Sequence, residues 1–102
     1  MRRASEHEIS RLHKQVVALY EQGKFVEAIL LAEQVVKLAL DSLGEEHPSY
    51  ATSLNNLAGL YHEIGRYEEA EHFYQEAMEI RRRILGEEHP SYATSLNNLA
   101  GL

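Results

Sequence analysis

The residues best suited to chemistry in this chain are its six histidines, which are accompanied by sixteen acidic residues and no cysteine. A helical zinc site needs two histidines four residues apart, and no two histidines here have that spacing. His47 and His89 each precede a proline in identical loops, which is typical of structural or capping residues. No nucleophile, glycine-rich phosphate loop or isolated carboxylate pair can be identified. The sequence therefore predicts no metal, no cofactor and no catalytic activity, and a metal-dependent enzyme is the alternative that metal analysis would exclude.

A different kind of chemistry is offered by two side-chain amides within a predicted helix that begins at Pro48. Asparagine is a poor helix former, and glycine destabilises a helix interior by about 1 kcal/mol relative to alanine. Asn55 and Asn56 would offer donors and acceptors to the main chain of a bound peptide, and Gly59 would let that peptide come close. Alternatively, one asparagine bridges neighbouring hairpins and the glycine only relieves crowding. The residues that share this helix face are Thr52, Asn55, Asn56, Gly59, His62 and Glu63.

The stretch LGEEHPSYATSLNNLAGL, from Leu43 to Leu60, occurs a second time without change from Leu85 to Leu102. The offset is 85 − 43 = 42 residues, and such a period marks stacked repeats that bury their apolar faces against neighbouring units. Identical copies indicate a recent duplication or an engineered sequence that ends inside its third unit. The amide face therefore recurs at Thr94, Asn97, Asn98 and Gly101, and the first predicted helix adds Ser10, His13, Lys14, Val17, Tyr20 and Glu21.

Apolar residues recur at steps of three and four along the chain, and no alternating or hairpin pattern is present, so helices are expected throughout. Glycines provide the stops, and Pro48 suits the first turn of a helix. The expected helices run over about 5–22, about 25–41, from Pro48 to the residue before Gly65, over about 67–84, and from Pro90 onward. Two helical hairpins and one unpaired helix give a right-handed all-α solenoid fragment.

The assignment also predicts whether individual residues near the helix ends are buried or exposed. The buried stripe of the third predicted helix is expected to include Ile64, and that of the fourth is expected to include Tyr67. Arg81, Arg82 and Arg83 are expected to face solvent at the end of the fourth helix, where positive charge interacts favourably with the helix dipole.

Length and composition restrict the classes of protein to consider. With 102 residues there is room for one domain, and the net charge of −6 argues against nucleic-acid and anionic-membrane partners. Polar residues follow Met1 where a signal peptide would need an apolar segment, and no run approaches the roughly 20 apolar residues of a membrane span. We therefore expect a soluble protein of the cytoplasm.

The run from Leu54 to Ile80 resembles a tetratricopeptide repeat, and the 42-residue period with its EEHPSYATSLNNLA segment resembles the kinesin-light-chain type. The first unit has Val16 at the small position and Gln15 where leucine is usual, which suits an end unit. The resemblance implies a single domain, 1–102, with units at about 5–42 and 43–84 and a half unit at 85–102. The family's landmarks are matched by Leu54, Leu57, Ala58, Tyr61, Gly65, Tyr67, Ala70, Tyr74 and Ala77.

Tetratricopeptide arrays are binding scaffolds, so the resemblance implies a concave groove for an extended peptide or partner helix, lined by the first helices of successive hairpins. With Lys14 as its one fixed cation, this groove is not expected to form the full carboxylate clamp of chaperone-binding relatives. A mildly acidic segment held through its main chain is expected instead. The predicted groove residues are Lys14, Thr52, Asn55, Asn56, Gly59, His62, Thr94, Asn97, Asn98 and Gly101.

The alternative function is self-association without a dedicated peptide ligand. The helix predicted at about 25–41 carries four apolar residues where the next unit has glutamate, histidine or arginine, and the last predicted helix has no helix to cover it. A second copy would bury both surfaces in a symmetric dimer, by helix exchange or by head-to-tail stacking, making a homo-oligomer. The predicted self-association residues are Val26, Ile29, Leu30, Leu40, Leu96, Leu99 and Leu102.

Overall fold

Five α-helices and no strand form within the part of the chain that the computed structural model describes. That part is the backbone of residues 3–100, together with its side chains except those of residues 96, 97, 99 and 100. The helices are α1 (Glu6–Glu21), α2 (Phe25–Leu43), α3 (Pro48–Glu63), α4 (Tyr67–Leu85) and α5 (Pro90–Ala100). The predicted all-α class and the predicted number of helices are both confirmed.

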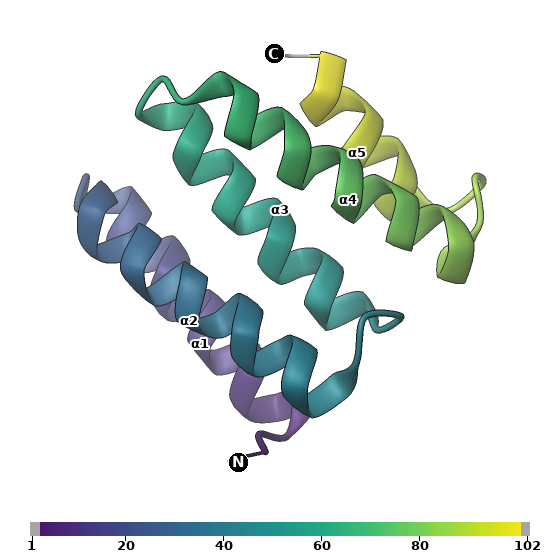
Figure 1. The fold of residues 1–102 in the computed structure, drawn as a ribbon, viewed down its shortest axis with the longest axis horizontal. Helices are drawn as coiled ribbons and strands as arrows, with labels where there is room; N and C mark the ends of the chain where they lie inside the picture. The colour runs from purple at the N-terminus through teal and green to yellow at the C-terminus, as the bar shows by residue number, and fades with distance from the viewer. Residues whose placement is uncertain (1–2, 101–102) are drawn as a thin grey trace.

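The helices are stacked in the order in which they occur in the sequence. Figure 1 shows the α1–α2 hairpin on one side, α3 in the middle, and α4 and α5 on the other side. Consecutive helices contact one another, and α1 also contacts α3 directly. This arrangement is an all-α solenoid, and it brings the first helices of successive hairpins to one face.

Three helix starts are capped by side chains, and this explains where those helices begin. The Oγ of Ser5 accepts a hydrogen bond from the backbone N–H of Glu8 at 3.1 Å. The Nδ1 of His47 accepts one from Ser49 at 3.0 Å, and His89 repeats this bond with Ser91 at 3.0 Å. Both histidines are therefore capping residues, as their identical loops predict.

The helices end at glycines because the backbone must there adopt a conformation that other residues avoid. Gly44, after α2, has φ = +88°, and Gly86, after α4, has φ = +86°. Each donates its backbone N–H to a carbonyl of the last helical turn, Leu40 and Arg82 respectively. The repeat period thus places the same stop after the second helix of each hairpin.

The core lies between the helices and combines a few large residues with many alanines. Ile9, Val35, Leu54 and Leu60 are the largest fully buried apolar side chains. The alanines that allow helices to approach closely are completely buried at Ala28, Ala39, Ala51, Ala58, Ala70 and Ala77. All six lie on α2, α3 and α4, so the close approach of helices is concentrated in the middle of the stack.

Two residues expected in the buried stripes are instead on the surface. Ile64 is 40% exposed because it follows the last residue of α3 and lies beyond the packed part of that helix. Tyr67 is 55% exposed at the first position of α4, where its ring contacts the edge of the His62 ring at a centroid distance of 5.2 Å. The apolar periodicity therefore predicted a buried stripe that extends too far into the α3–α4 turn.

The prediction that all three arginines near the end of α4 face solvent is wrong for Arg81. Its side chain is buried, and its Nη1 donates a hydrogen bond to the Oγ of Ser95 at 2.8 Å. Burial lowers the pKa of Arg81. Arg82 and Arg83 are exposed as predicted and form ion pairs with Glu79 and Glu46, both at 3.0 Å. Arg81 therefore connects α4 to α5.

Candidate functional site

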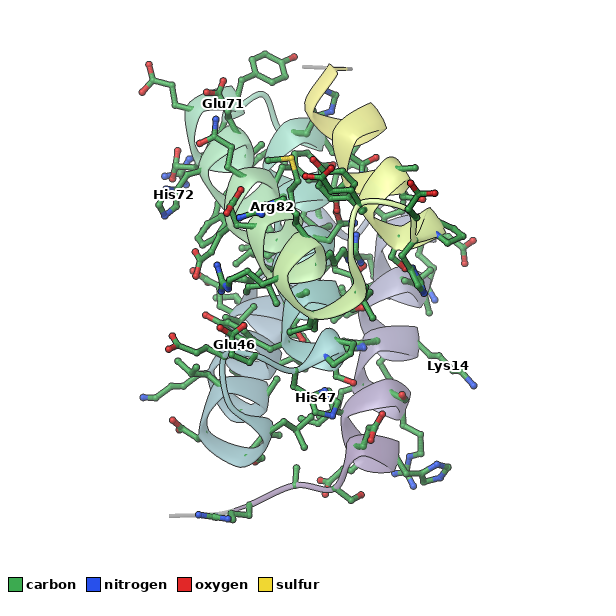
Figure 2. The ribbon with its side chains drawn as sticks, turned by 90° about the vertical axis from the view of Figure 1, so that its right-hand side faces the viewer. Lys14, Glu46, His47, Glu71, His72 and Arg82 are labelled. Atoms are coloured by element: carbon green, nitrogen blue, oxygen red, sulfur yellow. The ribbon has the colours of Figure 1, made fainter. Side chains whose placement is uncertain are left out.

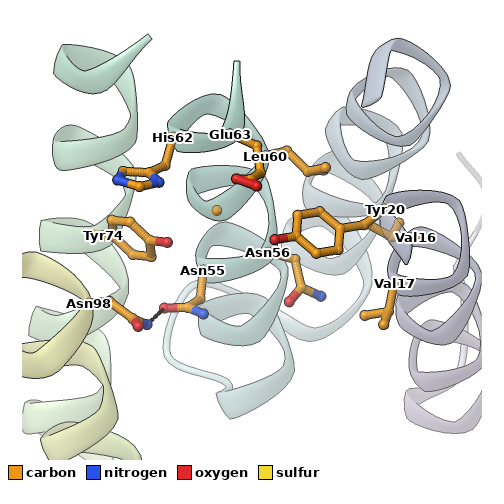
Figure 3. A pocket seen from close by; sticks show the side chains of 11 residues that line it. Val16, Val17, Tyr20, Asn55, Asn56, Leu60, His62, Glu63, Tyr74 and Asn98 are labelled. Carbon is orange, nitrogen blue, oxygen red and sulfur yellow. Dashed lines mark hydrogen bonds between the residues drawn. The ribbon is translucent and has the colours of Figure 1, made fainter. Parts of the chain in front are cut away.

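A cavity of about 310 Å³ opens on the face that α1, α3 and α5 share, and we refer to it as the central cavity (Figure 3). α3 supplies its middle, α1 supplies one side, and single residues from α4 and α5 supply the other. Its lining consists of Val16, Val17, Tyr20, Asn55, Asn56, Gly59, Leu60, His62, Glu63, Tyr74 and Asn98.

The floor of the central cavity is continuous with the hydrophobic core. Val16 and Leu60 line the cavity and are both almost fully buried, whereas Val17 remains exposed at the edge. Polar groups of α1, α3, α4 and α5 surround this apolar surface (Figure 3). An apolar floor with a few convergent polar groups is the usual composition of a binding site.

Two tyrosine hydroxyls and one carboxylate meet inside the cavity. Tyr20 of α1 and Tyr74 of α4 point their hydroxyls toward its centre from opposite sides (Figure 3). Burial and the negative charge of Glu63 raise the pKa of Tyr20. Burial, followed by the proximity of Tyr20 and Glu63, likewise raises the pKa of Tyr74. Both tyrosines therefore remain protonated at neutral pH and have hydroxyls that donate and accept.

The two adjacent asparagines of α3 have different environments. The Oδ1 of Asn55 accepts a hydrogen bond from the Nδ2 of Asn98 on α5 at 3.0 Å (Figure 3). Asn55 thus makes the bridge between repeats that was the alternative to peptide contact. Asn56 lines the cavity on the side of α1, and within the described residues its side chain forms no hydrogen bond. Its amide donor and acceptor are available to a ligand.

Gly59 lies where α3 passes Tyr74, so the absence of a side chain shapes the cavity. A Cβ atom at this position would be 3.4 Å from the Tyr74 hydroxyl oxygen, which is a close but ordinary contact. A methyl group would therefore fit, and it would occupy part of the cavity. Crowding alone does not require glycine here.

We expect Gly59→Ala to stabilise the folded protein by roughly 0.5–1 kcal/mol, because alanine is the better residue inside a helix. Urea denaturation followed by circular dichroism measures this change. Gly44→Ala is the matched control, and it should destabilise the protein by roughly 1–2 kcal/mol because Gly44 has φ = +88°. A loss of stability in Gly59→Ala would contradict the contact geometry.

A polar contact next to the cavity connects α1 to α3. The Nε2 of His13 lies 2.6 Å from the Oγ of Ser53, and this hydroxyl donates to the backbone carbonyl of Ser49 at 3.0 Å. Because the serine proton is used in that second bond, the histidine Nε2 carries a hydrogen and donates it to Ser53. Burial lowers the pKa of His13 below its ordinary value of 6.5.

His13 should therefore make stability depend on pH. Its pKa is lower in the folded than in the unfolded chain, so its contribution is complete above pH 6.5 and is lost as the pH falls toward the folded-state value. We expect the free energy of unfolding to decrease between about pH 7.5 and about pH 5.5, and to decrease less in His13→Gln. His7→Gln, at an exposed position of α1, is the control. Identical pH profiles of His13→Gln and the unmodified chain would contradict the assignment.

The structure brings together five of the ten predicted groove residues, Asn55, Asn56, Gly59, His62 and Asn98. Lys14, Thr52 and Thr94 do not line the cavity. Figure 2 shows the Lys14 side chain pointing away from the body of the molecule, and the hydroxyl of Thr94 donates to the carbonyl of Pro90 at 3.1 Å. The side chain of Asn97, and Gly101 as a whole, lie outside the described residues.

Sequence reasoning missed three lining residues: Val16 and Tyr74 were expected to be part of the buried helix stripes, and Leu60 was assigned neither to the groove nor to a buried stripe. All three are buried, so the core assignment of Val16 and Tyr74 is correct, and Leu60 belongs to the core as well. Tyr74 reaches the cavity because Gly59 leaves its hydroxyl uncovered. A glycine inside a predicted helix was the only signal of this opening in the sequence.

The outer side of α2 is a second surface of interest. Val26 is 72% exposed, Leu30 is 56% exposed and Leu40 is 39% exposed. Ile29, predicted to belong with them, is partly buried against the core. The predicted partners on the last helix, Leu96, Leu99 and Leu102, lie outside the described side chains.

Other kinds of site find no support among the described residues. No group of three or more histidine, aspartate or glutamate side chains there is arranged to hold a metal ion. None of the described helices has the length and apolar character that crossing a membrane requires.

Comparison with known proteins gives the family. The family model of the tetratricopeptide repeat matches residues 8–83 and 60–102, whereas no curated protein matches the chain. Tetratricopeptide repeats generally mediate protein–protein interactions.

Two crystal structures resemble the whole fold. BtubC (BKLC) from P. vanneervenii is 26% identical with a TM-score of 0.88, and the match covers 99% of this chain and 40% of that one. A putative kinesin light chain with nearly identical repeats from Podospora anserina is 32% identical with a TM-score of 0.87, and the match covers 99% and 48%. This chain thus spans less than half the length of both. The chain belongs to the tetratricopeptide repeat family and is of the kinesin-light-chain type.

Proposed function

We propose that this chain is a non-enzymatic scaffold that binds an extended peptide segment of a partner protein along the face of α1, α3 and α5. The observation that carries the proposal is the central cavity, in which an apolar floor is surrounded by polar groups from four helices. In this proposal the units at about 5–42, 43–84 and 85–102 form one domain, and their first helices supply the binding face.

Asn56 has the main role in this proposal. Its amide faces the cavity with neither donor nor acceptor used within the described residues, so it can bond to the N–H and C=O of an extended main chain. Asn55 and Asn98 instead hold α3 and α5 at a fixed separation through their 3.0 Å bond. This pair keeps the binding face in shape before the ligand arrives, which reduces the entropy that binding must overcome.

The test starts with a phage-displayed library of random dodecapeptides, selected on the complete chain and followed by calorimetry on synthetic copies of the selected peptides. We expect Asn56→Ala to weaken binding by roughly tenfold, which corresponds to about 1.4 kcal/mol. Gln34→Ala, which removes an exposed amide from α2, is the matched control and should leave affinity unchanged. Failure to select any peptide, or equal affinities for all three proteins, would refute the proposed function.

The exposed side of α2 favours self-association as a second function. Val26 and Leu30 are one helical turn apart, and Leu40 lies on the same side of α2. Burying such residues in an interface is favourable by roughly 1.5–3 kcal/mol for each side chain that becomes fully buried. A second copy of the chain is the partner proposed for this surface.

Light scattering after size exclusion, from micromolar to millimolar concentration, tests the second function. Self-association predicts a multiple of 11.7 kDa that returns to the monomer mass in Leu30→Glu. The peptide-binding function predicts instead that Leu30→Glu leaves peptide affinity unchanged. A monomer at all concentrations would exclude the second function and leave the first untouched.

A further inference from the structure

We infer that the central cavity binds a basic side chain, an arginine or lysine of the partner peptide, with Glu63 as its counter-ion. This inference rests on the proposed function and specifies the chemistry of the ligand. It reverses the mildly acidic peptide that the sequence favoured, because the cation on which that expectation depended, Lys14, does not line the cavity.

The lining of the cavity carries one fixed charge, which is negative. Glu63 is the only aspartate, glutamate, lysine or arginine among the lining residues. Within the described residues, the Glu63 carboxylate forms no ion pair with a lysine or arginine of the chain. A cationic ligand group would therefore meet an opposite charge that no internal cation already neutralises. The net charge of −6 would also favour the approach of a basic segment.

The walls of the cavity suit the shape and polarity of a basic side chain. An arginine or lysine has an apolar stem and a cationic head, so it needs an apolar passage that ends at acceptors. Val17 and Leu60 provide apolar surface at the edge and floor. The hydroxyls of Tyr20 and Tyr74 point to the centre and can accept hydrogen bonds beside the Glu63 carboxylate (Figure 3).

Arginine fits these acceptors better than lysine. A guanidinium carries five N–H donors in one plane, whereas an ammonium carries three that are more strongly hydrated. The carboxylate of Glu63 and two tyrosine hydroxyls from opposite walls can be reached by a single planar group. Aromatic rings also attract a cation placed over their faces, and arginine uses this contact more often.

Packing behind the walls keeps the aromatic rings in place. The ring of Tyr20 packs against Phe25 with a centroid distance of 5.7 Å, and the ring of His62 contacts Tyr67 at 5.2 Å. Tyr74 is buried apart from the hydroxyl region that Gly59 leaves open. These ring contacts restrict the wall side chains before a ligand binds, which reduces the ordering needed on binding.

The experiment uses an array of capped dodecapeptides with random flanks and one fixed central residue, which is arginine, lysine, leucine or glutamate. Binding of the complete, fluorescently labelled chain is measured at low and moderate salt. We expect arginine peptides to bind at least tenfold tighter than glutamate peptides, with lysine second, and we expect added salt to reduce this preference. In Glu63→Gln, which keeps the size of the side chain, the preference should disappear.

The control and the reversed variant complete the test. Glu21→Gln removes the same charge from α1 at an exposed position outside the cavity, and it should keep the preference for arginine. Glu63→Lys should shift the preference to glutamate peptides. Circular dichroism confirms that each variant is folded.

Three results would overturn the inference, and they separate it from the proposed function. A preference for arginine that persists in Glu63→Gln, or equal binding of all four peptide classes, would refute the basic-side-chain site. If Asn56→Ala still weakened that equal binding, the proposed peptide scaffold would survive. If no peptide class bound at all, both would fail together.

Discussion

Replacing Leu54 with alanine is expected to lower the free energy of unfolding by about 2–5 kcal/mol, the largest effect of any single substitution considered for this protein. Leu54 is 1% exposed and lies on α3, which contacts α1, α2 and α4. Two free-energy contributions add up to this loss. One is the favourable transfer of the removed methyl groups out of water, and the other is the cost of a cavity that close-packed neighbours cannot fill. Since a domain of this size is stable by only about 5–15 kcal/mol, a substantial fraction of the total would disappear.

The repeat offers a matched control for this prediction. Leu12 occupies the position of Leu54 one unit earlier, since 54 − 12 = 42, but on α1 it is only partly buried. Leu12→Ala should therefore be clearly less destabilising than Leu54→Ala. Urea denaturation of both variants, with m-values compared to confirm two-state unfolding, measures the difference. Equal losses would contradict the view that the middle of the stack holds most of the core.

Most of the fold could be predicted because its signals are local. Apolar spacing and glycine stops gave α1 as about 5–22 and α2 as about 25–41, and the structure has Glu6–Glu21 and Phe25–Leu43. The histidine caps were also correct because a cap depends on residues two or three positions away. Ile64 and Tyr67 were misplaced because periodicity cannot tell where the neighbouring helices stop covering a helix end.

The candidate site was predicted less completely, for a related reason. Helical spacing places Asn55, Asn56 and Gly59 on one face, but it does not tell which neighbour each will meet. The bond from Asn98 to Asn55 crosses 43 residues of sequence, and the distance between Gly59 and Tyr74 depends on how α3 packs against α4. Lys14 was included among the groove residues because it shares a face of α1. The first residue of α1 that lines the cavity is Val16, which lies farther toward the C-terminal end of that helix.

Arg81 shows the same limit in the core. The sequence has three arginines in a row near a helix end, a pattern that usually belongs to a solvent-exposed surface. The two copies of the repeated segment place the same serine at positions 53 and 95, but their partners differ. Ser53 contacts His13 of α1, whereas Ser95 accepts from Arg81 of α4, and the first unit has Ala39 where the second has Arg81. Identical sequence thus occupies two different environments.

This difference leads to the second prediction, that Ser95→Ala destabilises the protein by about 1–3 kcal/mol. The substitution leaves a buried guanidinium without the acceptor that it has at 2.8 Å. We expect the effect to be concentrated on α5. The substitution should increase the rate at which α5 amide protons exchange with solvent more than the rate for α3. Hydrogen exchange followed by mass spectrometry, together with urea denaturation, measures both parts of this prediction.

A double-mutant cycle distinguishes the lost bond from a general loss of packing. Replacing both partners, as Arg81→Met with Ser95→Ala, removes the buried charge and its acceptor together, so this variant should recover most of the stability that Ser95→Ala loses. Ser53→Ala serves as the control at the equivalent position, because it disturbs α1 and α3 and should leave the exchange of α5 unchanged. If the double variant were as unstable as the sum of the single variants, the Arg81–Ser95 contact would contribute no coupling. The attachment of α5 would then depend on apolar packing alone.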